Sequence, residues 1–360
     1  MPVIPGQLYR GLLRPILFSL DAEIAHHLTL SMLSMMPPLP VAPDPPELRC
    51  SLWGMEFLNP IGLAARMDKD AIAIGAWQSL GFGFAELGTI TPRPQPGNPK
   101  PRVFRLPEHR ALINRLGFPS EGMEAVAPRI EKARRGGTRI RIALNFGPNK
   151  DTPVEKVAAD YAALMARLAA LADFIVINVS SPNTPGLRNW QSPEKMRELF
   201  AAMEQAPTAA RRPPMLIKVA PDLDDATLDA ICDAAIALHL DGIVVCNTTL
   251  KRSEVGVTSA LDGGLSGHPL RDLARARIAG VYRRTQGKLP IIGVGGIMNA
   301  DDALGHLRAG ASLVEVYTGL IYEGPALITM IKKELATLLR REGFRSISEA
   351  VGSAAKVSDP

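Results

Sequence analysis

The sequence contains little cysteine and no long apolar run. Its cysteines are Cys50, Cys232 and Cys246, and no two of them form a CxxC pair, so neither a disulfide framework nor a structural zinc site is expected. No apolar run reaches the roughly 18 residues that a membrane-spanning helix requires. The first residues also lack the pattern of a cleaved secretory signal. These absences favour a protein of the reducing cytoplasm.

The sequence has no concentrated block of positive charge. Lys and Arg number 41 against 36 Asp and Glu, which gives a formal charge of +5. The densest basic pairs begin at Arg134, Arg211 and Arg283, far apart and without aromatic residues among them. Nucleic-acid-binding proteins instead gather basic residues on one stripe or face. We therefore expect no nucleic-acid partner.

Eight short apolar runs, rich in Val and Ile, predict buried parallel strands. They cover residues 59–65, 82–91, 139–146, 173–179, 215–220, 242–247, 290–294 and 312–317. Helical patterns separate them, and helix starts are indicated at Thr152-Pro153, Ser192-Pro193 and Asn299. This alternation predicts a (β/α)₈ TIM barrel. A doubly wound open sheet is the alternative, but Ala64-Ala65-Arg66 after the first strand is not its glycine fingerprint.

The rest of the chain surrounds this barrel, which we assign to residues 41–345. Residues 1–40 predict two amphipathic helices, which either pack on the outside of the barrel or dip into a membrane to collect an apolar substrate. Residues 346–360 are expected to be a flexible tail. The proline-rich segment 91–101 is expected to fold over the active face, and the insertion 250–267 to form a lid.

Active sites of such barrels lie at the carboxyl ends of the strands. After the last two strands come Gly295-Gly296 and Thr318-Gly319, whose backbone N–H groups suit a phosphate. The glycines otherwise only permit tight turns. This position favours a phosphate-bearing cofactor such as FMN.

Lysines and asparagines also follow the strands. Lys69 and Lys218 either pair with Asp68 or Asp222 or face a flavin or substrate anion. Four asparagines suit a planar ligand with alternating N–H and C=O groups, such as a pyrimidine: Asn145, Asn178, Asn183 and Asn247. Few carboxylates and no His/Cys cluster stand at these ends, so a metal site is not expected.

Several motifs closely resemble those of class 2, membrane-associated dihydroorotate dehydrogenases. The most specific is the segment 178–188 (NVSSPNTPGLR), and others are 95–99, 113–118, 247–249, 263–267 and 293–297. The segment 17–26 is similar to the N-terminal hairpin of that class, which class 1 enzymes lack. Class 1 enzymes use a cysteine base.

The resemblance implies an FMN-containing barrel that oxidises (S)-dihydroorotate to orotate in pyrimidine biosynthesis and passes electrons to a quinone. It implies that Ser181 is the base. The matching substrate contacts are Lys69, Asn114, Arg115, Leu116, Gly117, Phe118, Asn178, Asn183, Asn247 and Thr248. The matching FMN contacts are Ala65, Arg66, Met67, Asp68, Lys69, Thr89, Asn145, Asn178, Lys218, Cys246, Gly267, Gly296, Tyr317 and Thr318.

The resemblance also implies a place in the cell. Arg105 and Tyr317 lie where the family approaches quinone. The chain is expected to be a monomer bound peripherally to the cytoplasmic side of the cell membrane.

One departure from the family concerns the flavin directly. Where the family has Ala-Ala-Gly-Phe-Asp-Lys, residues 64–69 read Ala-Ala-Arg-Met-Asp-Lys. A glycine beside a cofactor commonly leaves room that a side chain would fill. Arg66 therefore either turns out to solvent or crowds the flavin. It also motivates an alternative function, a degenerate barrel that binds a pyrimidine or a membrane without turnover.

Overall fold

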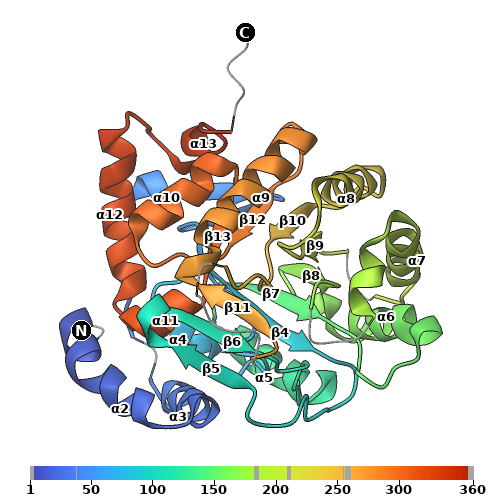
Figure 1. Cartoon of the computed structure of the whole chain (residues 1–360), viewed down its shortest axis with the longest axis horizontal. Helices are drawn as coiled ribbons and strands as arrows, with labels where there is room; N and C mark the ends of the chain where they lie inside the picture. The colour runs from blue at the N-terminus through green and yellow to red at the C-terminus, as the bar shows by residue number, and fades with distance from the viewer. Residues whose placement is uncertain are drawn as a thin grey trace.

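The protein forms a closed barrel of eight parallel strands (Figure 1). The structure is a computed structural model that describes residues 4–37, 39–181, 186–208, 212–253, 255 and 261–355. The barrel strands are β3 (Ile61–Leu63), β4 (Phe84–Ile90), β7 (Arg141–Phe146), β8 (Phe174–Asn178), β9 (Met215–Val219), β10 (Gly242–Val245), β12 (Ile291–Val294) and β13 (Leu313–Val316). Pairing of β13 with β3, with Val314 opposite Ile61, closes the ring. The predicted TIM barrel is confirmed.

Helices cover the outside of the barrel because its strands bury both faces. They are α4 (Ile74–Ser79), α5 (Met123–Arg135), α6 (Val157–Leu168), α7 (Pro193–Glu204), α8 (Asp225–Ala237), α9 (Arg271–Thr285), α10 (Ala300–Ala309) and α12 (Leu327–Arg341). The short helix α11 (Thr318–Glu323) contacts α12 instead. Ser192 and Asn299 cap α7 and α10 as predicted. The cap predicted at Thr152 is wrong, because its hydroxyl donates to Asp160 and α6 begins only at Val157.

Aromatic side chains close the amino-terminal end of the barrel. A short hairpin, β1 (Cys50–Leu52) and β2 (Met55–Phe57), precedes the first barrel strand. Phe57 packs edge-to-face on Phe84 and contacts Phe174, which begin β4 and β8. A ligand site is therefore left to the opposite end of the barrel.

A second sheet lies over the carboxyl end of the barrel strands (Figure 1). It consists of β5 (Val103–Leu106), β6 (Ala111–Asn114) and β11 (Gly264–Gly267), all antiparallel. These three strands were not predicted from the sequence. Gly264 is needed here, because a Cβ atom would lie 1.8 Å from Oγ1 of Thr248. The lid predicted over 250–267 thus ends in a strand, and residues 254 and 256–260 lie outside the described residues.

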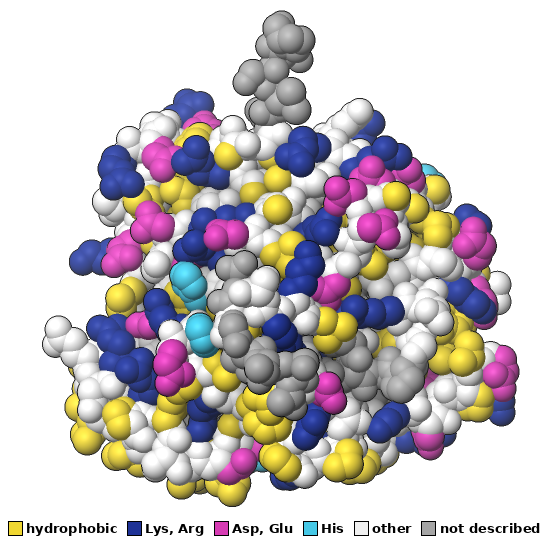
Figure 2. Space-filling model, viewed as in Figure 1, with side chains coloured by type: hydrophobic (Ala, Val, Ile, Leu, Met, Phe, Trp, Pro, Cys, Tyr) yellow, Lys and Arg dark blue, Asp and Glu magenta, His cyan; other side chains and the backbone are white. Residues whose placement is uncertain are grey.

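The N-terminal segment forms the two predicted helices and lies beside the barrel. α1 (Gly6–Leu8), a π-helical turn (Tyr9–Leu13) and α2 (Arg14–Ser19) form the first, and α3 (Ala22–Ser34) the second. Apolar side chains on these helices and their ends remain exposed: Ile4, Leu8, Leu12, Ile16, Leu20, Ile24, Leu28, Met32 and Met35. Figure 2 shows hydrophobic side chains along the margin where α2 and α3 lie. Within the described residues, none of the helices is long and apolar enough to span a bilayer.

The C-terminal segment differs from its prediction. Residues 347–355 do not form a free tail, because α13 (Ile347–Ala350) buries Ile347 and Ala350. The N–H groups of Gly352 and Ala354 donate to the carbonyls of Leu307 and Arg308 at the end of α10. The predicted flexible tail is therefore wrong for this stretch, and residues 356–360 lie outside the described part.

A buried ion pair fastens the N-terminal helices to the barrel. The guanidinium of Arg102 donates to both carboxylate oxygens of Glu23, with a shortest distance of 2.6 Å, and both side chains are buried. Burial raises the pKa of Glu23, but the hydrogen bonds and charge of Arg102 and the charge of Lys100 lower it overall. This pair therefore stabilises the folded state above the ordinary carboxyl pKa and stops doing so as the pH falls through the lowered one.

Arg102→Met is expected to lower the free energy of unfolding by about 3–5 kcal/mol at about pH 7.5, because Glu23 is left buried without its partner. The loss should be smaller at about pH 4, because Glu23 of the variant, buried without Arg102, has a raised pKa and takes up a proton there. Urea unfolding at both values measures this, with exposed Arg139→Met as the control. Arg102 also bonds the carbonyls of Pro96 and Asn98, which do not titrate. An equal loss at both pH values would therefore assign the effect to these carbonyls.

Candidate active site

The carboxyl ends of the barrel strands and the second sheet enclose a small cavity of about 60 Å³. Its polar side chains come from strand ends and from β6 and β11. Twelve of the site residues expected from the sequence line it: Ala65, Arg66, Asn114, Asn178, Lys218, Cys246, Asn247, Thr248, Gly267, Gly296, Tyr317 and Thr318. The fold therefore brings together residues that are up to 253 positions apart in the chain, from Ala65 to Thr318.

Three asparagines form a hydrogen-bonded row across the barrel end. The amide of Asn178 donates to Oδ1 of Asn145 at 3.3 Å and to Oγ1 of Thr89 at 3.0 Å. Asn247 in turn donates to Oδ1 of Asn178 at 3.5 Å and to Oγ of Ser180 at 3.0 Å. Because each amide offers both donors and an acceptor, the row fits a planar ligand of the same kind. The fourth asparagine, Asn183, lies outside the described residues.

Lys218 lies between two carboxylates inside the barrel. Its Nζ is 3.0 Å from both oxygens of Glu86 and 3.5 Å from Glu315. Burial alone would lower the pKa of Lys218, but these two carboxylates raise it. Burial and the neighbouring Glu86 carboxylate both raise the pKa of Glu315. The pKa of Glu86 is lowered, because the charge of Lys218 outweighs the effect of burial. Lys218 is thus charged and already neutralised within the protein.

Neither predicted partner of Lys218 is correct. The carboxylate of Asp68 accepts from the N–H groups of Ile72 and Ala73 and from the indole of Trp77 at 2.7–2.8 Å, so it fixes the start of α4. Asp222 accepts instead from Arg188 at 3.3 Å.

Two acids that lie inside the barrel, within the strands rather than after them, were not predicted from the sequence. Glu86 and Glu315 are single acids within otherwise apolar strands, and this pattern is the signal that could have revealed them.

Glycines at one edge of the cavity leave backbone donors unused. Within the described residues, the N–H groups of Gly296 and Gly319 have no acceptor. The tight-turn interpretation also holds, since a Cβ on Gly296 would lie 2.5 Å from Cα of Arg271. Free N–H groups at this edge, with Lys218 deeper in, are the donor set that a nucleotide phosphate and a flavin ring require.

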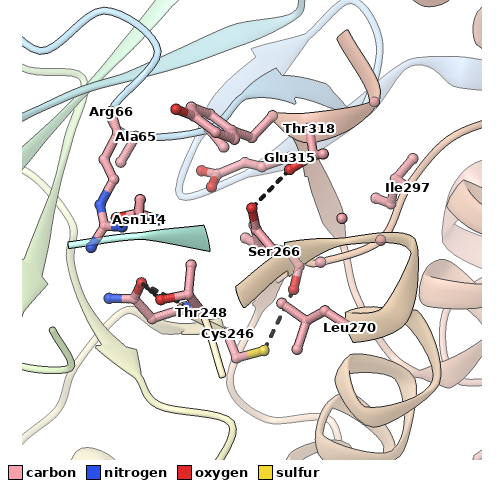
Figure 3. A pocket seen from close by; sticks show the side chains of 18 of the residues that line it. Ala65, Arg66, Asn114, Cys246, Thr248, Ser266, Leu270, Ile297, Glu315 and Thr318 are labelled. Atoms are coloured by element: carbon pink, nitrogen blue, oxygen red, sulfur yellow. Dashed lines mark hydrogen bonds between the residues drawn. The ribbon is translucent and has the colours of Figure 1, made fainter. Parts of the chain in front are cut away.

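The side chain of Arg66 lies inside this cavity rather than in solvent. It runs past Ala65 and ends at Asn114 (Figure 3), where Nη1 donates to Oδ1 at 2.7 Å. Its backbone has φ of +77°, a conformation that residues with a Cβ rarely adopt. The remaining cavity, of about 60 Å³, has room for only a few water molecules. The hydrogen-bond donors of the cavity therefore suit a flavin nucleotide. The cavity is large enough for one only when the Arg66 side chain moves out of it.

A second, larger cavity of about 620 Å³ lies beneath the N-terminal helices. Four predicted site residues, Met67, Lys69, Leu116 and Tyr317, line it together with Arg105. His26 of α3 also lines it, and its Nε2 has no partner. Burial, and then the charge of Lys69, lowers the pKa of His26 to about 3. Tyr317 borders both cavities.

The remaining predicted site residues line neither cavity: Asp68, Thr89, Arg115, Gly117, Phe118, Asn145 and Ser181. Ser181 follows β8 and is completely buried. The guanidinium of Arg115 turns away from the cavities to the carbonyl of Pro101. No three His, Cys, Asp or Glu side chains among the described residues are grouped as a metal site would require.

Lys218→Met is expected to lower the free energy of unfolding by about 3–5 kcal/mol at about pH 8, because Glu86 then lies buried without its partner. The loss should shrink at about pH 5, since an unpartnered buried carboxylate has a raised pKa and is protonated there. Urea unfolding at both values tests this. Exposed Lys333→Met is the control, and a loss independent of pH would argue against the ion pair.

Comparisons with known proteins agree over nearly the whole chain. The family model described as dihydroorotate dehydrogenase matches residues 47–339. A protein of Rhodospirillum rubrum named dihydroorotate dehydrogenase (quinone) is 50% identical over 345 residues, covering 94% of this chain and 93% of its own. A protein of the same name from Acidithiobacillus ferrooxidans is 48% identical, covering 96% and 99%.

Solved structures show the same fold. The structure of DHODH in complex with ferulenol from Eimeria tenella has a TM-score of 0.87 at 38% identity, covering 93% of this chain and 96% of its own. The ligand-free form from the same organism has a TM-score of 0.88, covering 92% and 99%. Because the family model covers most of the chain and the relatives match it nearly from end to end, the chain belongs to the dihydroorotate dehydrogenase family.

Proposed function

We propose that this protein oxidises (S)-dihydroorotate to orotate with FMN and passes the electrons to a membrane quinone in pyrimidine biosynthesis. The observation that carries the proposal is the cavity at the carboxyl end of the barrel, where Asn114, Asn178 and Asn247 converge beside free backbone donors. Two near-full-length relatives carry the name dihydroorotate dehydrogenase (quinone), which agrees with this chemistry.

The asparagines bind and orient the pyrimidine ring. Asn178 is held from below by Thr89 and Asn145, so its amide plane is set before a ligand arrives. Asn247 is held by Ser180 in the same way. A ring with alternating N–H and C=O groups then meets complementary donors and acceptors without further rearrangement, which lowers the cost of binding.

The edge formed by Gly267, Gly296 and Thr318 would hold the phosphate of FMN, and Ala65, Lys218 and Cys246 would surround its ring. FMN bound there would supply the acceptor for the hydride that leaves C6 of the substrate. Lys218 holds a positive charge at that ring, although Glu86 and Glu315 neutralise much of it. Both acids lie in the barrel core, so water does not reach them.

The resemblance of segment 178–188 makes Ser181 the base, although it lines neither cavity. Its Oγ takes the proton from C5 of the substrate while its own hydroxyl proton leaves through a proton relay. Ser181 follows the strand that carries Asn178 and is shielded from solvent. Cys246 is the other candidate base, because class 1 enzymes use cysteine. Burial raises the pKa of the Cys246 thiol to about 12, so little of the thiolate that would accept a proton is present at neutral pH.

The larger cavity takes the quinone. Its wall is mostly apolar, with Leu13, Leu17 and Leu33 among the lining residues, and it lies beneath helices whose outer faces expose apolar side chains. Such helices rest in the interface of a bilayer without crossing it. We place the protein as a monomer on the cytoplasmic side of the cell membrane, with these helices in contact with lipid.

The alternative is a barrel that binds a pyrimidine without turnover, and Arg66 favours it by standing in the flavin's space. The purified protein, with FMN supplied, separates the two. Under the first proposal, dihydroorotate bleaches the flavin absorbance without oxygen. Protein that stays colourless with added FMN supports the alternative.

Ser181→Ala should slow the bleaching of the flavin by dihydroorotate about 10²–10⁴-fold and leave FMN bound, because it removes the base and not a cofactor contact. Stopped-flow absorbance measures the rate, and the flavin-to-protein absorbance ratio measures the FMN content. A rate equal to that of the unchanged protein would remove Ser181 from the mechanism.

The double variant Leu12→Glu/Ile24→Glu should bind phosphatidylglycerol vesicles at least about tenfold more weakly, because two charges replace exposed apolar groups of the N-terminal helices that line neither cavity. Reduction of quinone embedded in those vesicles should fall in parallel, while dihydroorotate still bleaches the flavin at the normal rate. Leu58→Glu, at an exposed apolar position on the barrel, is the control. Unchanged vesicle binding would show that the helices only pack on the barrel.

A further inference from the structure

Arg66 and Lys218 are the two cations that line the smaller cavity within the described residues. Their electrostatic situations differ. Lys218 forms ion pairs with Glu86 and Glu315. Arg66 forms no ion pair with any described carboxylate, and its hydrogen bond goes to the neutral amide oxygen of Asn114. An anion that enters this cavity therefore meets one cation whose charge is not yet balanced.

The free donors of Arg66 face the cavity. A guanidinium carries five N–H donors, and here one nitrogen bonds to Asn114. Every nitrogen of the Arg66 side chain either has a hydrogen-bond partner or is accessible. The side chain lines the cavity wall. Its remaining N–H groups therefore point to the space that a ligand would occupy. A cation held in the interior without a counter-ion is costly, and a bound anion removes that cost.

Arg66 is also placed among the groups that recognise the ring. Asn114, Asn178, Asn247 and Thr248 line the same cavity, and Asn114 touches Arg66 directly. Lys69, the other lysine expected to meet an anion, lines the larger cavity instead. The amides thus supply neutral hydrogen bonds, and the guanidinium supplies the planar pair of donors that matches a carboxylate.

We propose that Arg66 binds the carboxylate of the substrate and so selects an anionic pyrimidine over a neutral one. This inference rests on the proposed function and names the group that recognises the charged end of that substrate. In the bound state the guanidinium gives up its hydrogen bond to Asn114. Two of its parallel N–H groups then donate to the two carboxylate oxygens. The same movement frees space in the cavity.

The test uses the FMN-loaded protein and isothermal titration with orotate and with its uncharged methyl ester. Arg66→Met keeps a long side chain and removes its charge. Because Met also carries a Cβ, the strain of the positive φ is the same in both proteins. This variant should weaken orotate binding by about 30-fold or more, while the affinity for the methyl ester changes by less than about threefold. Arg66→Lys should restore part of the affinity for orotate. Exposed Arg283→Met is the control and should bind both ligands normally.

Each other outcome has a definite meaning. Equal orotate affinity in Arg66→Met, or equal weakening for the ester, overturns the assignment while the proposed function stands. A loss of FMN affinity, measured by flavin fluorescence, with unchanged orotate binding would mean that Arg66 contacts the nucleotide. That result would also overturn the assignment. If the unchanged protein binds no orotate, the proposed function fails together with this inference.

Discussion

The site depends on the ion cluster in which Lys218 lies between Glu86 and Glu315 within the barrel. Charges at this depth persist only when they are paired. The cluster also supports the asparagine row, since the amide of Asn145 donates to Glu86 and Asn178 donates to Asn145. Breaking the cluster would therefore disturb the hydrogen bonds that fix the amides proposed to bind the pyrimidine, as well as the charge next to them.

The cluster also decides which cation remains available. A lysine at a strand end suggests an anion-binding group, but the Glu86 carboxylate, with Glu315 beside it, already neutralises Lys218. The charge that faces the cavity without a counter-ion is that of Arg66, at a position where the family resemblance of segment 64–69 implies glycine. Its positive φ of +77° shows that the backbone has the shape that suits glycine even with a side chain present.

Much of the fold could be predicted because local pattern decides it. Parallel strands buried on both faces read as continuous apolar runs, and all eight barrel strands were predicted from this pattern. The second sheet was missed because β11 is the glycine-rich segment Gly264–Gly267, and its partner β6 lies about 150 residues earlier. Short strands of low propensity form only when tertiary contacts supply the partner. The C-terminal segment was mistaken for a tail for the same reason, since Gly352 is held by α10.

The sequence by itself determined the barrel, the order of its strands and the motifs that gather at their carboxyl ends. It did so because periodicity and strand-end position are local properties. Only the tertiary structure decided how these residues divide between two cavities, which acids neutralise Lys218, and whether Arg66 points inward. These outcomes depend on distances between side chains far apart in the chain, and closure of the barrel is what sets those distances.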